Sequence, residues 1–130
     1  MIDIKTAPYA ALVLRVALGV MFIAHAALKI FVFTPAGTVG FFQSVGLPGP
    51  LAYAVIAAEL IGGLALILGL ATRWVAIALL PILLGATWVH AGNGWLFTNA
   101  NGGWEYPAFL TAALIAQALL GGGAHSATKH

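Results

Sequence analysis

Residues 51–91 read LAYAVIAAELIGGLALILGLATRWVAIALLPILLGATWVHA, two apolar runs separated by Ala71-Thr72. A helix of about 20 mostly apolar residues is long enough to cross the hydrocarbon core of a bilayer. The runs 51–70 and 73–91 both approach that length. Because so little chain separates them, the two helices must reverse direction in a tight turn and pack side by side. This stretch therefore predicts a helical hairpin inside a membrane.

Two further apolar runs flank the hairpin, at 8–33 before it and at 105–120 after it. Prolines and glycines break the segment 34–50, where the aromatic pair Phe41 and Phe42 indicates a short stretch of helix lying at the membrane interface. Residues 124–130 have the composition of a flexible tail. The sequence thus predicts an all-α fold, a single transmembrane domain over 1–130 built as an integral membrane four-helix bundle with one short interfacial segment.

The composition supports this class and excludes others. Hydrophobic residues make up 62% of the chain and charged residues 6%, and the mean hydropathy is +1.05, so the lipid bilayer is the expected solvent. There is no cysteine, which excludes disulfides, thiolate metal sites and a dithiol relay within the chain. The five basic residues are spread along the sequence without a basic patch, so no nucleic-acid partner is expected.

The positions of the basic residues predict the orientation. Lys5, Arg73 and Lys129 fall on one side of a four-span arrangement, whereas the loops 34–50 and 91–104 contain neither Lys nor Arg. Cytoplasmic loops of membrane proteins are enriched in these residues. Both termini are therefore predicted to be cytoplasmic, and both long loops to lie outside.

Ionisable residues inside the spans are costly in lipid and each needs a partner or a task. Arg15, His25 and Lys29 share one side of the first helix, since His25 and Lys29 lie about 40° apart and Arg15 about 80° from His25 at helical periodicity. Glu59 lies near the middle of the second span. Glu59 can pair with Arg15 or with His25 and Lys29 at the other end of this stripe. We expect an Arg15–Glu59 pair whose role is structural, because it would hold the two helices in register.

A second polar group is predicted at the outer boundary. Glu105 begins the last helix and His90 ends the third, near the expected level of Lys29, with Trp104 beside them in an aromatic belt. Glu105 could also serve only as a helix-capping residue. His25, His90 and Glu105 could in principle form a metal triad, but they lack a spacing typical of metal ligands, so no metal site is predicted.

The ordered motifs of the chain resemble the DoxX family of small four-helix membrane proteins. The resemblance rests on Leu14-Arg15, Leu18-Gly19, His25, Lys29, Glu59-Leu60-Ile61-Gly62-Gly63, Leu68-Gly69-Leu70-Ala71-Thr72-Arg73, Asn93-Gly94-Trp95 and Gly102-Gly103-Trp104-Glu105-Tyr106-Pro107. It implies similarity to the membrane subunit of thiosulfate:quinone oxidoreductase and to members linked to quinone or catechol reduction. A multi-pass protein of the bacterial inner membrane is expected.

The leading functional hypothesis is a quinone-interacting component of an oxidoreductase. A quinone needs apolar walls, a hydrogen-bond donor for its carbonyl and a nearby proton source. His25 is the predicted proton donor, Lys29 the electrostatic stabiliser and Glu105 the proton relay, while Arg15, Glu59, His90 and Trp104 are predicted to contact the ligand. No flavin or nicotinamide motif is present, so electrons are expected from a soluble or membrane-bound redox partner.

Two other functions remain open. In one, the chain is a non-catalytic scaffold or assembly subunit that recruits a soluble redox enzyme, and the polar stripe only holds the helices together. In the other, the chain carries a small solute or lipid, which four short helices could achieve only as an oligomer. Homo-oligomers are plausible because Gly62 and Gly63 could pack either within the chain or between copies.

Overall fold

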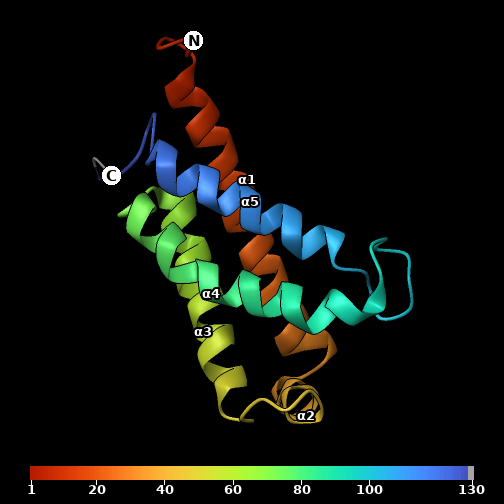
Figure 1. The fold of residues 1–130 in the computed structure, drawn as a ribbon. Helices are drawn as coiled ribbons and strands as arrows, with labels where there is room; N and C mark the ends of the chain where they lie inside the picture. The colour runs from red at the N-terminus through yellow and green to blue at the C-terminus, as the bar shows by residue number, and fades with distance from the viewer. Residues whose placement is uncertain (129–130) are drawn as a thin grey trace.

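The computed structural model describes residues 1–128, which form helices and loops without a strand. The elements are α1 (Ala7–Ala27), its π-helical continuation η1 (Leu28–Val32), α2 (Pro35–Ser44), α3 (Leu51–Leu68), α4 (Thr72–His90), the 3₁₀ turn η2 (Ala91–Asn93) and α5 (Glu105–Leu120). Helix α1 packs against α3 and α4 packs against α5, and α3 connects the two pairs through the turn into α4 (Figure 1). The start of α1 and the end of α5 lie toward the end of the molecule that holds this turn (Figure 1).

Three helical segments are long and apolar enough to cross a membrane: Ala7–Val32, Leu51–Leu68 and Thr72–Asn93. They coincide closely with the predicted spans 8–33, 51–70 and 73–91. The predicted all-α class is confirmed, and the molecule is a multi-pass membrane protein. Helix α5, with 16 residues, is shorter than these spans, and α2 is an additional helix, so the expected four-helix bundle describes the fold only in part.

Two glycines let α1 and α3 touch through their backbones. A Cβ atom placed on Gly19 would lie 2.6 Å from the carbonyl oxygen of Gly63, and one placed on Gly63 would lie 2.8 Å from that of Gly19. Gly62 is packed against Leu79 of α4 in the same way. The small-residue face predicted at Gly62 and Gly63 therefore makes contacts within the chain, which is the role such residues have between membrane helices.

The connection between α1 and α3 is more helical than the sequence indicates. The Oγ1 atom of Thr34 accepts a hydrogen bond of 3.1 Å from the Gly37 N–H, and Pro35 occupies the first turn, so α2 begins well before the aromatic pair on which the interfacial segment was placed. This is the usual chemistry of a helix start, a hydroxyl cap followed by proline.

The segment after α5 folds back onto the other helices. The backbone N–H groups of Ala124, Ala127 and Thr128 donate hydrogen bonds of 2.9, 3.1 and 3.1 Å to the carbonyls of Pro8, Leu68 and Gly69. This differs from the flexible tail predicted for residues 124–130, since 124–128 are part of the packed end of the molecule. Residues 129–130 lie outside the described part of the chain.

Candidate functional site

An ion pair connects the end of the first span to the middle of α3. Lys29 Nζ lies 2.8 Å from Glu59 Oε1, and the two side chains are 20% and 5% exposed. Lys29 belongs to the π-helical turn η1, a type of distortion that often occurs at functional sites. The sequence leaves the partner of Glu59 open, and in the structure it is Lys29.

Arg15 binds backbone oxygens instead of a carboxylate. The residue is 1% exposed. Its guanidinium donates hydrogen bonds to the carbonyls of Leu66 (3.1 Å), Ile67 (2.6 Å), Gly122 (2.9 Å) and Ala124 (2.9 Å). The last carbonyls of a helix have no partner within the helix and carry its negative dipole end, so a cation is stabilised there. The expected Arg15–Glu59 pair is therefore not formed, and Arg15 instead fastens the segment after α5 to the end of α3.

His25 faces α5 through an aromatic contact. Its Nδ1 atom lies 2.6 Å from the carbonyl oxygen of Met21, and because that oxygen only accepts, Nδ1 carries the proton. The imidazole centre lies 5.9 Å from the ring centre of Tyr106, whose hydroxyl donates to the Met21 sulfur at 3.5 Å. Tyr106 thus joins the start of α5 to α1 directly beside His25.

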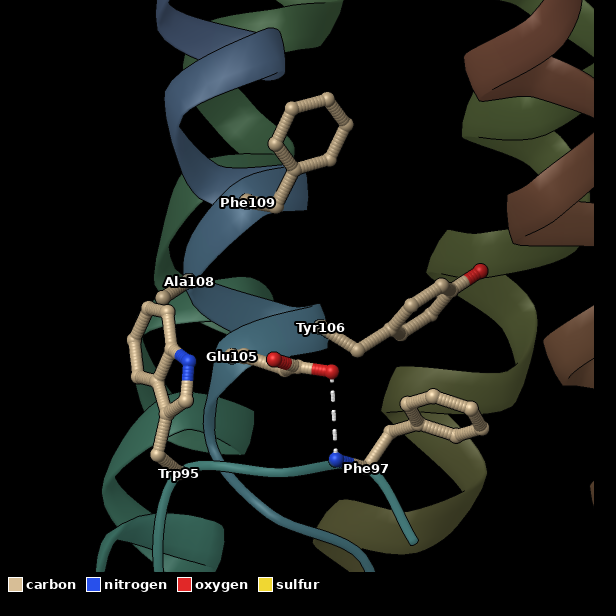
Figure 2. A pocket seen from close by; sticks show the side chains of 6 residues that line it. All are labelled: Trp95, Phe97, Glu105, Tyr106, Ala108 and Phe109. Carbon is tan, nitrogen blue, oxygen red and sulfur yellow. Dashed lines mark hydrogen bonds between the residues drawn. The ribbon is translucent and has the colours of Figure 1, made fainter.

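A pocket of about 610 Å³ opens at the start of α5. Its walls are largely aromatic, and its lining residues are Trp95, Phe97, Glu105, Tyr106, Ala108 and Phe109 (Figure 2). Within it, Glu105 Oε1 accepts a hydrogen bond of 3.2 Å from the Phe97 N–H. The structure therefore places one predicted catalytic residue, Glu105, in an open, largely aromatic pocket.

The loop between η2 and α5 forms one side of this pocket and depends on Gly103. The N–H groups of Trp104 and Glu105 donate to the carbonyls of Gly94 (2.9 Å) and Trp95 (3.1 Å), which closes the loop on itself. A Cβ atom on Gly103 would overlap the carbonyl oxygens that cross over it. Trp104 is predicted to contact a ligand but does not line the pocket. It packs edge-on against Trp95, a lining residue, with ring centres 4.4 Å apart.

His90 is held by its own helix, with Nδ1 donating to the Ala86 carbonyl at 2.8 Å. Within residues 1–128, no three His, Asp or Glu side chains gather in a way that could hold a metal ion. The alternative triad of His25, His90 and Glu105 is therefore not assembled.

The predicted site residues thus separate into distinct groups. Lys29 and Glu59 form one pair, Arg15 binds carbonyls at the C-terminal end of α3, and Glu105 lines the pocket. Sequence reasoning missed Tyr106, which lines the pocket and contacts His25. It also missed the other aromatic residues of the lining, Trp95, Phe97 and Phe109. The signal was present, because Tyr106 follows Glu105 in the Trp104-Glu105-Tyr106-Pro107 motif, to which only Glu105 and Trp104 were assigned roles.

These features define a multi-pass membrane protein with a small aromatic, acidic pocket outside its longest spans. The family model for DoxX matches residues 10–92, and the chain belongs to the DoxX family. The resemblance inferred from the sequence is thereby confirmed, although α5 and all six residues that line the pocket lie beyond the matched range.

A relative from Bacillus subtilis (strain 168), named "Putative oxidoreductase CatD", is 44% identical over 75 residues. The match covers 58% of this chain and 54% of the relative, so the chain spans about half the length of that protein. No solved structure gives a significant match.

Proposed function

We propose that this DoxX protein is a quinone-interacting component of an oxidoreductase and that the pocket at the start of α5 holds the quinone ring. The observation that carries the proposal is the combination of aromatic walls with one carboxylate, Glu105, in a cavity of about 610 Å³. Flat apolar walls suit an aromatic ring, and a single polar group orients it. The name of the Bacillus subtilis relative, an oxidoreductase, agrees with this reaction class.

We assign the residues as follows. Glu105 exchanges a proton with the bound ring, and Tyr106 forms a wall. His25 stays the proposed proton donor. It does not line the pocket itself, but its ring contacts Tyr106, which does. Lys29, already paired with Glu59, has a positioning role in place of the electrostatic stabilisation of the ring oxygen expected from the sequence. Electrons come from a soluble or membrane-bound redox partner.

The proposed topology places the pocket outside. We assign α5 as a fourth crossing, with both termini cytoplasmic in a bacterial inner membrane. In that arrangement Lys5, before α1, and Arg73, at the start of α4, fall on the same side, and the loop before α5 carries neither Lys nor Arg. The chain has no cysteine, so single-cysteine labelling is clean. A membrane-impermeant maleimide applied to intact cells should label Gly92→Cys and spare Ser126→Cys, and the reverse pattern would overturn the orientation.

Quinone binding can be measured with the full chain in lipid nanodiscs. Addition of a short-chain ubiquinone analogue should quench tryptophan fluorescence saturably, since Trp95 lines the pocket. Phe109→Ala should weaken binding about tenfold, because it removes a large apolar contact. Phe31→Ala is the matched control, since Phe31 is 80% exposed and outside the pocket. Equal binding by both variants, or no saturable quenching, would reject the proposal.

A second candidate is the non-catalytic scaffold. The observation in its favour is that Arg15, Lys29 and Glu59 all bind groups of the chain itself. A scaffold predicts stable co-purification with a soluble redox enzyme and no quinone binding in the assay above. Under the leading proposal, the purified chain binds quinone without that enzyme.

A further inference from the structure

We infer that the pocket at the start of α5 selects the reduced, hydroxyl-bearing form of a quinone over the carbonyl form. This inference rests on the proposed function and adds which form of the ring the site recognises. It concerns binding alone. The two ring forms differ in their oxygens, because a hydroquinone hydroxyl both donates and accepts hydrogen bonds, whereas a quinone carbonyl only accepts.

The acceptor in the pocket is Glu105. Its Oε1 atom is bound by the Phe97 N–H, and Oε2 has no protein donor within the described residues. Figure 2 shows both carboxylate oxygens inside the pocket, one directed to Phe97 and the other toward the side of Trp95. Glu105 is half-buried, and its second carboxylate oxygen is available to accept a hydrogen bond from a ligand that enters the pocket.

The donor in the pocket is the indole N–H of Trp95, which faces the Glu105 side of the cavity (Figure 2). The other side-chain donor in the lining, the Tyr106 hydroxyl, is directed to the Met21 sulfur on α1. The cavity therefore offers one strong acceptor beside one donor.

A phenolic hydroxyl satisfies both groups at once, donating to Glu105 and accepting from Trp95. A quinone carbonyl in the same place accepts from Trp95 but brings its lone pairs against the carboxylate, which is repulsive. An organic cation would be attracted by Glu105 and the aromatic rings but could not accept from Trp95. The hydroxyl form is thus the occupant that matches the whole lining.

The test compares both forms of one ring on the full chain in nanodiscs under anaerobic conditions. Decylubiquinol should bind about tenfold more tightly than decylubiquinone, the ratio expected for one charge-assisted hydrogen bond. The dimethyl ether of the quinol has no donor and should lose this advantage. Glu105→Gln should remove or reverse the preference, because an amide can also donate to a carbonyl. Asp3→Asn alters an exposed carboxylate that is outside the pocket and far from Glu105 in the sequence, so it should leave the ratio of quinol to quinone affinity unchanged.

The outcomes separate the two proposals. Equal affinities for quinol and quinone would overturn the inference and leave the proposed function standing, whereas no binding of either would overturn both. Competition by tetramethylammonium with no quinol preference would show that the site takes organic cations. If Glu105→Gln is poorly folded, Trp95→Phe gives an independent result, since it should weaken both forms and keep the quinol preference.

Discussion

Lys29 Nζ lies 2.8 Å from Glu59 Oε1, so a π-helical turn at the end of the first span is joined to the middle of α3 by a single ion pair. The carboxylate is nearly buried and the ammonium is one fifth exposed. Attraction between two such charges is strong only where water is scarce, and removal of one partner leaves the other without compensation. The pair therefore fixes the register of the first span against α3, one helical turn before Gly63.

Removing one charge should destabilise the protein more than removing both. Lys29→Met should lower the free energy of unfolding by about 2 kcal/mol or more, because Glu59 is left unpaired. The double variant Lys29→Met with Glu59→Leu should recover most of the loss, since apolar side chains suit this position. Thermal unfolding in detergent micelles measures both. A double variant as unstable as the sum of its two single variants would argue against the pair.

Arg15→Leu should release the segment after α5. The substitution leaves the carbonyls of Leu66, Ile67, Gly122 and Ala124 without their common donor, which we expect to cost about 3 kcal/mol or more. Hydrogen exchange should accelerate at the amides of residues 124–128. Arg73→Leu is the control, because the Arg73 Nε atom donates to Ala118 within α5, and its effect on those amides should be small. Unchanged protection in Arg15→Leu would show that the segment is held by other contacts.

Gly19→Ala should disrupt the close approach of α1 and α3. The added methyl would lie 2.6 Å from the Gly63 carbonyl oxygen, and overpacking of this kind costs about 1–3 kcal/mol. Gly85→Ala is the matched control in α4, where nothing lies within 4 Å of the added atom. That variant should be stabilised by about 0.5–1 kcal/mol, because alanine favours a helix interior. Equal melting temperatures for the two variants would contradict the packing.

Gly103→Ala should damage the pocket and spare the helices. The methyl would collide with carbonyls of the loop that forms one wall, so ligand binding should fall by more than tenfold while the far-UV circular dichroism stays the same. Gly92→Ala, with open space around the added atom, should bind normally. A Gly103→Ala protein with full affinity would place the binding site away from this loop.

The sequence predicts the long helices well because lipid imposes a length and an apolar composition on each span. Ala71-Thr72 indicates the hairpin correctly, and the turn is made by Gly69 at φ +75° and Ala71 at φ +44°. The Thr34-Pro35 dipeptide is typical of a helix start, and α2 does begin there. The glycines that follow it favour a loop, so the sequence does not predict the full helix.

The partners of the charged residues were not predictable to the same degree. Side-chain chemistry suggested Arg15 with Glu59, because both lie in spans and attract. Arg15 binds main-chain carbonyls instead. Because every residue has a carbonyl, no residue type in the sequence identifies the four carbonyls that meet around Arg15. The π-helical turn at Lys29 likewise leaves no residue signature. Tyr106 was visible in its motif, but its contact with His25 depends on how α5 crosses α1.

The hydrogen bonds of Arg15 also bear on the order in which this protein is made. Residue 15 leaves the ribosome early, whereas two of its four acceptors, at Gly122 and Ala124, are synthesised more than a hundred residues later. Until then the guanidinium must stay hydrated at the membrane surface or rely on α3 alone. The set of hydrogen bonds that holds Arg15 is therefore complete only once the segment after α5 has been synthesised.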